Sequence, residues 1–386
     1  MEPGSLAELC ASRRILVVVG SGGVGKTTTA ATLALVAALK GRKVLVLTID
    51  PARRLADALG LQALGHDIQR VPDDKLQTVA AQRGMARAAG GYLDAMMLDQ
   101  KRAFDEVVRR YASDPAVLNR IMNNSIYQQI SSSLAGSHEY AAVSKLYELA
   151  QTTDYDLLVL DTPPTENALD FLDAPDKVSQ AVDSPAVQWI MKPYTQAGTW
   201  SLRMLGMGSA IVLRGLARFA GSAFLAQIAE FFVEFSQVMT GFRERALQVR
   251  TLLRKPEVSF VLVCSPEPLS VEEALYFHER LMAAQMAVGG CVVNRVHAPG
   301  PTMPEDLMPL LVSRSELAGV GRDDVQKLAD ELSRTYQEQQ ILATADARSL
   351  ERLAQTVKVV PRRIPMLEQD IHDAAGIALV SQYLVP

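Results

Sequence analysis

The chain has 386 residues, a length that fits two or three domains or one large α/β domain with insertions. Its 39 Lys and Arg against 43 Asp and Glu give a net charge of −4, so no overall positive field exists to hold nucleic acid, which we exclude as a main partner. Three scattered cysteines without a C-x-x-C pair exclude a disulfide framework and a four-cysteine zinc site.

No secretory signal and no membrane span are expected. The N-terminal residues lack a basic region followed by an apolar block. The longest uncharged, mostly apolar stretches fall short of the roughly 18–20 residues that a membrane span needs. We therefore expect a cytoplasmic protein.

Short apolar runs predict the strands of a buried parallel sheet. The first run, Arg14–Gly20, has three adjacent valines and ends at a glycine, which is typical of a strand that is covered on both faces. Further predicted strands are Lys43–Ile49, Asp156–Leu160, Val258–Cys264, Gly290–Val293 and Val357–Val360. Helical stretches such as Thr28–Lys40 and Ser270–Ala284 lie between them, so we predict a doubly wound α/β fold with a mostly parallel sheet.

Two long segments, about 82–152 and 175–255, show no strand pattern and are predicted to be helical insertions that form a subdomain. In the second, an apolar stripe repeats every three or four residues: Phe224, Ile228, Phe231, Phe235, Val238 and Phe242. The stripe fits a core face, an apolar groove for a hydrophobic client, or a dimer contact. The preceding stretch, Trp189–Leu213, is rich in methionine and aromatic residues, which suits an adaptable binding surface. Asp323–Gln355 is predicted to be a helix with a solvated, charged surface.

A phosphate-binding loop follows the first predicted strand and precedes a helix. The residues Gly20, Ser21, Gly22, Gly23, Val24, Gly25, Lys26 and Thr27 match G-x-x-x-x-G-K-[ST], and Thr28 follows. Glycines let the backbone N–H groups turn toward a phosphate, and the helix N-terminus adds positive partial charge. Lys26 is expected to reach the β- and γ-phosphates, and Thr27 to offer a hydroxyl ligand to Mg²⁺. Residues 1–386 are thus predicted to form a single P-loop ATPase domain that binds ATP with Mg²⁺.

Two aspartates follow other predicted strands. Asp161 ends Leu157–Asp161 and is the candidate for holding the water shell of Mg²⁺, with Thr27, unless it merely caps the next turn. Asp50 ends the second predicted strand, where parallel-sheet folds bind ligands, and is the candidate for orienting the attacking water. An N-cap role for Asp50, with Pro51 at the first helical position, is compatible with this. Asp50 and Lys26 are therefore the predicted catalytic residues.

These motifs resemble a known ATPase family. The P-loop, Asp50-Pro51-Ala52 and Asp161-Thr162-Pro163-Pro164-Thr165 are similar to the P-loop, switch I and switch II of the deviant-Walker ATPases. Within that class, which includes the MinD and ParA types, the chain most resembles a single-half, bacterial-type relative of the arsenical pump ATPase (ArsA) and of the ATPase for guided entry of tail-anchored proteins. The resemblance implies that Asn294, in Val292-Val293-Asn294-Arg295, reads the adenine base, and that Pro361 belongs to the loop that packs on adenine.

The chain departs from this family at Ser21, where the hallmark is a lysine that reaches the nucleotide of a dimer partner. A hydroxyl cannot supply that positive charge to the phosphate oxygens. Either Arg53 or Arg54 supplies it, or turnover is slow, or the chain pairs with a homologue that carries the lysine. We favour slow hydrolysis coupled to dimer closure.

The cysteines depart from the family pattern as well. As(III) needs about three converging thiolates, whereas Cys10, Cys264 and Cys291 fall before or within predicted core strands and are expected to be small buried hydrophobes. The lack of C-x-x-C excludes a zinc clasp between two chains.

The resemblance implies a nucleotide-gated homodimer, or heterodimer with a homologous ATPase, whose helical subdomain binds a hydrophobic or membrane-protein client. The alternatives are a positioning or scaffold protein of the MinD and ParA type, and a binding-only paralogue that has lost hydrolysis. Positioning members usually end in a basic amphipathic helix, whereas residues 370–386 contain no Lys or Arg, which counts against that type.

Overall fold

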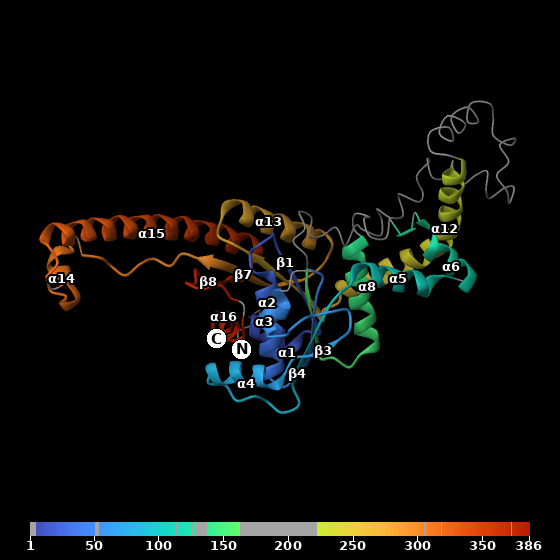
Figure 1. The fold of residues 1–386 in the computed structure, drawn as a ribbon, viewed down its shortest axis with the longest axis horizontal. Coiled ribbons are helices and arrows are strands. Elements are labelled where there is room, and N and C mark those ends of the chain that lie inside the picture. The colour runs from blue at the N-terminus through green and yellow to red at the C-terminus, as the bar shows by residue number, and fades with distance from the viewer. Residues whose placement is uncertain are drawn as a thin grey trace.

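An eight-stranded sheet forms the centre of the molecule (Figure 1) in the order β3-β4-β2-β5-β1-β6-β7-β8. This computed structural model describes residues 5–50, 54–112, 114–125, 127–128, 137–162, 222–304, 306–317, 319–371 and 373–386. Only β3 is antiparallel to its neighbour, and the other strands are parallel. The strands are β1 Ile15–Val19, β2 Lys43–Thr48, β3 Gln69–Arg70, β4 Tyr92–Met97, β5 Leu157–Asp161, β6 Val258–Cys264, β7 Val288–Val296 and β8 Arg362–Pro365.

Helices cover both faces of the sheet. One face packs against α1 (Leu6–Ser12), α2 (Lys26–Leu39), α3 (Arg54–Leu59), α4 (Asp73–Gln82) and α16 (Ala374–Leu384). The opposite face packs against parts of α8 (Ser137–Thr152), α12 (Ser222–Leu253), α13 (Pro268–Ala283) and α15 (Arg322–Val357). Further helical elements are α5 (Gln100–Tyr111), α6 (Pro115–Asn123), α14 (Met308–Val312) and a 3₁₀ turn at Ser315–Leu317. The predicted doubly wound, mostly parallel α/β fold is confirmed.

The alternation of side chains along each strand explains the two layers. In β1, Leu16 and Val18 enter the core beside α2, whereas Ile15, Val17 and Val19 enter the core on the other face. All five residues are fully buried, because both faces are covered. Five of the six predicted strands are confirmed with small shifts at their ends.

The predicted strand Val357–Val360 is wrong. Val357 is the last residue of α15, and Lys358 ends that helix in the left-handed conformation with φ of +55°. Leu350, Leu353 and Val357 are buried at spacings of three and four residues, so Val357 completes the apolar face of a helix. The β-branched valines in this segment led to the prediction of a strand, because valine is common in strands. The strand β8 begins only at Arg362.

The segment 82–152 is not purely helical, because it contains the sheet strand β4. Asp94 interrupts the apolar run Tyr92–Met97, so the sequence lacks the continuous apolar pattern of a strand that is buried on both faces. The carboxylate is nevertheless buried, since Tyr155 donates a hydrogen bond of 2.6 Å to it and Arg70 of β3 forms an ion pair with it. A satisfied buried charge therefore replaced the expected apolar residue.

The helices α5 and α6 pack with parts of α8 and α12 into a lobe beside the sheet (Figure 1). Residues of these four helices form a separate apolar core, in which Phe231 and Phe235 stack with ring centroids 5.1 Å apart. Ile228 and Val238 also belong to this core, so the core interpretation is confirmed for these four stripe residues. The side chains of Phe224 and Phe242, and the stretch Trp189–Leu213, lie outside the described residues.

The helix α15 extends away from the sheet on the side opposite to the lobe (Figure 1). At 1.5 Å per residue its 36 residues span about 54 Å. Its predicted charged surface is confirmed, since Glu331, Arg334, Glu338 and Arg348 are exposed. Among the described residues, no helix is long and apolar enough to cross a membrane.

Candidate nucleotide-binding site

The loop Gly20–Gly25 joins β1 to α2, and the residues from Gly20 to Thr28 therefore lie together at the carboxyl edge of the sheet. Two glycines are sterically required there. A Cβ atom on Gly20 would lie 1.9 Å from the carbonyl oxygen of Val263 in β6, and one on Gly25, where φ is +96°, would lie 2.5 Å from the Asn294 amide nitrogen. The sequence thus allows the loop to press against β6 and β7, which leaves its backbone N–H groups available to a phosphate.

Lys26 is the first residue of α2 and is almost fully buried. Its Nζ atom donates a hydrogen bond of 2.6 Å to the carbonyl oxygen of Ser21 across the loop. Burial lowers the pKa of Lys26, while the carboxylates of Asp161 and Asp50 act in the opposite direction. The ammonium group is therefore positioned inside the loop, where the phosphates of a nucleotide would replace the carbonyl as its partner.

Asp161 ends β5 beside the P-loop and is completely buried. Its Oδ2 atom accepts hydrogen bonds from the hydroxyl groups of Thr27, at 2.8 Å, and Thr48, at 2.9 Å. Its Oδ1 atom is buried, and no described residue forms a hydrogen bond with it. Burial raises the pKa of Asp161 to about 6, although the two threonine hydroxyls and Lys26 lower it.

These residues fit a hydrated Mg²⁺ ion. A buried, unpaired carboxylate oxygen is costly unless a cation or a water molecule satisfies it. Mg²⁺ prefers oxygen ligands and keeps several of its waters, and Thr27 Oγ1 and the Asp161 carboxylate offer the oxygen atoms that such a hydrated ion needs. The donor set predicted from the sequence is therefore brought together by the fold.

Asp50 follows β2 and is mostly buried, with its side chain 15% exposed. Its backbone N–H donates to the Thr48 hydroxyl at 3.2 Å, so Thr48 links the backbone of Asp50 to the Asp161 carboxylate. Arg54, in the first turn of α3, lies with Nη1 3.9 Å from Asp50 Oδ2. Residues 51–53, and with them Arg53, lie outside the described part of the chain.

A cavity of about 290 Å³ opens in front of these groups. It is lined by Gly23, Gly25, Lys26, Thr27, Thr28, Asp50, Arg54, Asp57, Thr162, Arg295 and Ile371. Sequence reasoning missed Asp57, Arg295 and Ile371. Asp57 lies one helical turn after Arg54, so the spacing could have revealed it. No sequence signal points to Ile371, which the chain brings in from the loop between β8 and α16.

The two predicted adenine residues have different positions. Asn294 in β7 contacts the P-loop directly, since its Nδ2 atom donates a hydrogen bond of 3.0 Å to the carbonyl oxygen of Val24. Pro361 lies just before β8, whose first residue pairs with Val292, so it precedes the level of Asn294 along the sheet. The structure therefore brings Asn294 into contact with the P-loop, whereas Pro361 is not among the described residues that line the nucleotide cavity.

Ser21 replaces the hallmark lysine and contacts the next strand–helix connection. Its hydroxyl oxygen lies 3.2 Å from that of Ser270 in α13, and Ser270 accepts a hydrogen bond of 3.0 Å from the backbone N–H of Ser265. The three cysteines are buried, as expected of small hydrophobes. Among the described residues, no cluster of His, Cys, Asp and Glu side chains could hold a metal ion by itself.

Comparison with known proteins agrees with this geometry. The family model described as "Anion-transporting ATPase" matches residues 13–342. The chain is 26% identical over 291 residues to the protein named ATPase GET3 of Podospora anserina, covering 75% of each chain. It is 25% identical over 326 residues to ATPase get3 of Pyrenophora tritici-repentis, covering 83% of this chain and 84% of the relative. ATPase get3 of Aspergillus niger is 25% identical over 331 residues, with coverage of 84% and 82%.

Proposed function

Because the chain belongs to the anion-transporting ATPase family and is a nucleotide-binding ATPase, we propose that Mg²⁺ and ATP bind together in the P-loop cavity and that hydrolysis gates a dimer. The dimer consists of two copies of this chain, or of this chain and a homologous ATPase. Its helical lobe binds an apolar segment of a client, such as a membrane protein before insertion, in the cytoplasm. The observation that carries the nucleotide chemistry is the buried Asp161: its Oδ2 atom accepts a hydrogen bond from Thr27, and its Oδ1 atom has no hydrogen-bond partner among the described residues.

Each residue of the cavity has a distinct part in the proposed reaction. Lys26 exchanges the Ser21 carbonyl for the β- and γ-phosphate oxygens. Thr27 and Asp161 would hold Mg²⁺ and its waters, and the bound ion would neutralise charge that develops on the phosphates. Asp50 orients the attacking water and is kept in place by the Thr48 hydroxyl. Asn294 is proposed to recognise the adenine edge.

The apolar stripe does not support a client-binding role at the four residues that the structure describes. Ile228, Phe231, Phe235 and Val238 are used by the core of the lobe, so they offer no free groove. The support comes instead from the composition of Trp189–Leu213 and from the family relationship. We therefore propose that the client contact lies in the helical insertions and does not involve these four residues.

Phosphate release by the Asp50→Asn variant tests the proposed hydrolysis. Since the amide cannot accept a proton from water, we expect turnover to fall at least about 100-fold while ATP affinity changes little. Lys26→Ala should weaken ATP binding itself, because the phosphates lose their cation. Asp330→Asn, an exposed change on α15, is the matched control and should behave as the parent. Unchanged turnover in Asp50→Asn would remove Asp50 from its role, and ATP binding by the parent without phosphate release would favour the binding-only alternative.

A co-purification experiment tests the client. The Asp50→Asn variant, loaded with ATP and Mg²⁺, should retain a protein that ends in one apolar membrane segment and release it when ADP replaces ATP. The same protein with that segment made polar is the control and should not be retained. Equal recovery of both proteins would contradict the proposal, and ATP-dependent flotation with liposomes alone would favour the positioning alternative.

A further inference from the structure

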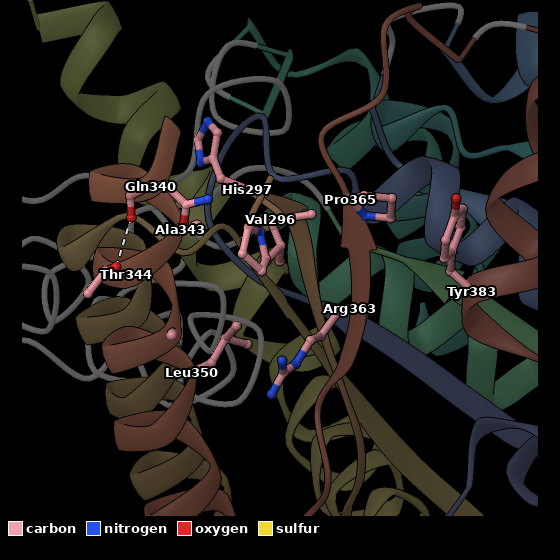
Figure 2. A pocket seen from close by; sticks show the side chains of 12 residues that line it. Val296, His297, Gln340, Ala343, Thr344, Leu350, Arg363, Pro365 and Tyr383 are labelled. Carbon is pink, nitrogen blue, oxygen red and sulfur yellow. Dashed lines mark hydrogen bonds between the residues drawn. The ribbon is translucent and has the colours of Figure 1, made fainter. Parts of the chain in front are cut away.

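A second cavity, larger than the nucleotide cavity, lies at the β8 edge of the sheet (Figure 2). It measures about 540 Å³ and is enclosed by the chain after β7, by α15, by β8 and by Tyr383 of α16. Its apolar lining includes Val296, Pro299, Ala343, Ala347, Leu350 and Pro365. We call it the α15 groove. Its volume lies within the roughly 300–1,000 Å³ that is typical of small-molecule sites.

The α15 groove is separate from the nucleotide cavity, since the two have no lining residue in common. The strand β7 contributes to both. Arg295 lines the nucleotide cavity, whereas the next residue, Val296, lines the α15 groove. In β8, Ile364 enters the core on the α2 side, and the neighbouring Arg363 and Pro365 line the groove, as alternation along a strand requires.

One charged side chain of the groove, Arg363, has no counterion among the residues that the structure describes. Figure 2 shows Arg363 extending from β8 on the side of the strand where α15 lies. Within the described part of the chain, no carboxylate forms an ion pair with Arg363. A guanidinium group beside an apolar wall is a strong recognition element for a carboxylate or another planar anion.

Two other polar side chains of the groove, His297 and Gln340, already have partners. His297 pairs with the buried Asp346, since Nδ1 lies 2.9 Å from Asp346 Oδ2 and the backbone N–H donates to the same oxygen at 2.7 Å. Gln340 Nε2 donates to the carbonyl oxygen of Gly300 at 3.3 Å, which fixes the loop after β7 against α15. The Asp346 carboxylate is thus paired with His297, and Arg363 is the charged side chain of the groove that is able to bind a ligand.

From this arrangement we propose that the α15 groove binds a small organic anion with an apolar body. The apolar body lies against Val296, Ala343, Ala347 and Leu350, and its carboxylate pairs with Arg363. The ligand is a free small molecule of the size of a medium-chain carboxylic acid. The proposal requires neither ATP hydrolysis nor a client, so it stands or falls independently of the function proposed above.

Calorimetric titration of the full chain with octanoate and with 1-octanol tests this site, because the two probes share their apolar chain and differ in charge. The parent should bind octanoate at least about tenfold more tightly than 1-octanol. Arg363→Gln should lose that preference while 1-octanol binding changes little. Ala347→Trp, which fills the groove, should abolish the binding of both probes. Arg348→Gln, an exposed α15 residue outside the groove, is the matched control and should bind as the parent does.

Three results would overturn the proposal: no octanoate binding by the parent, equal binding of octanoate and 1-octanol, or an unchanged octanoate preference in Arg363→Gln. Because Arg363 is exposed, its substitution should leave the fold intact. Circular dichroism and the thermal midpoint of each variant verify this, and Arg363→Gln therefore decides the question even if Ala347→Trp does not fold.

Discussion

At the scale of single residues, Asp161 connects the chemistry of the site with its stability. The carboxylate is buried, and within the described part of the chain only one of its two oxygens is hydrogen-bonded. Burial raises the pKa of Asp161 from 3.8 to about 6. The folded state therefore holds a proton more tightly than the unfolded state, and ionisation of Asp161 above pH 6 destabilises the fold by about 3 kcal/mol in the absence of Mg²⁺.

Urea unfolding of Asp161→Asn in EDTA tests this linkage. Between pH 4.5 and 7.5 the free energy of unfolding of the parent should fall by about 2 kcal/mol more than that of the variant, because the amide does not ionise. The penalty is absent well below the unfolded pKa and complete above the folded pKa. Asp330→Asn should retain the pH dependence of the parent. Parallel curves for the parent and Asp161→Asn would show that Asp161 does not titrate as described.

Arg54 is the residue that tests how the chain manages without the hallmark lysine at Ser21. Its side chain lines the nucleotide cavity and lies near Asp50, yet it is 64% exposed and able to move toward the phosphates. We expect Arg54→Ala to lower phosphate release about tenfold or more, because a positive charge beside the γ-phosphate stabilises the transition state. Arg54→Lys should restore part of the rate, and the exposed Arg348→Ala should have no effect.

An unchanged rate in Arg54→Ala would show that Arg54 does not compensate for Ser21. The remaining explanations would then be a contribution from Arg53, slow turnover, or a partner chain that carries the lysine. Mixing with a homologue separates the last of these, since only a trans lysine would raise turnover in the mixture.

Residues joined by a local motif could be predicted, whereas residues joined only by the fold could not. The P-loop, Asp50 and Asp161 each follow an apolar run, and strand ends of a parallel sheet meet at one edge. Arg295 has no such signal, because its position depends on a left-handed backbone with φ of +63° at the end of β7. The expectation for Pro361 depends on the resemblance of Val359-Val360-Pro361-Arg362-Arg363 to a family loop, and in the structure both valines lie in the connection between α15 and β8.

At the scale of elements, α12 determines the stability of the lobe. Phe235 is 5% exposed and stacks on Phe231 within the core that joins α12 to α5, α6 and α8. Phe235→Ala should lower the free energy of unfolding by about 3–5 kcal/mol, since it leaves a cavity in this core. Leu247→Ala on the same helix, where the side chain is 62% exposed, should change it by less than about 0.5 kcal/mol.

Hydrogen exchange locates the effect of Phe235→Ala. Faster exchange confined to α5, α6, α8 and the first half of α12 is expected, because β1 and its neighbours have a separate core. Equal stability of the parent and Phe235→Ala would contradict the core assignment of the stripe and reopen its interpretation as a client groove.

The elements most easily predicted are those whose pattern has a single physical cause. The five confirmed strands are mostly apolar and contain no buried charge before the strand end, because both faces of the sheet are covered. The strand β4 was not predicted, because its Asp94 is paired with Arg70 and hydrogen-bonded by Tyr155, which lie 24 and 61 positions away in the sequence. No local window contains that information.

At the scale of the whole molecule, the proposed dimer is the main expectation. Light scattering of Asp50→Asn with ATP and Mg²⁺ should give twice the 42.0 kDa mass of one chain, and the same protein with ADP should give a smaller average mass. Lys26→Ala is the control and should not respond to ATP. A mass that is independent of nucleotide would contradict nucleotide gating while leaving hydrolysis itself untouched.

The strand order also determines when the central strand of the sheet can pair while the chain is being translated. β1 lies between β5 and β6, and Ile15 pairs with both Leu158 and Val258, the latter 243 positions later in the sequence. At roughly 5–20 residues per second, a ribosome needs on the order of 10–50 s to supply the second neighbour of β1. During that time at least one edge of β1 has no neighbouring strand, and a molecular chaperone can cover its valines. The P-loop is translated among the first residues, yet its contact with Asn294 can form only after most of the chain has been translated.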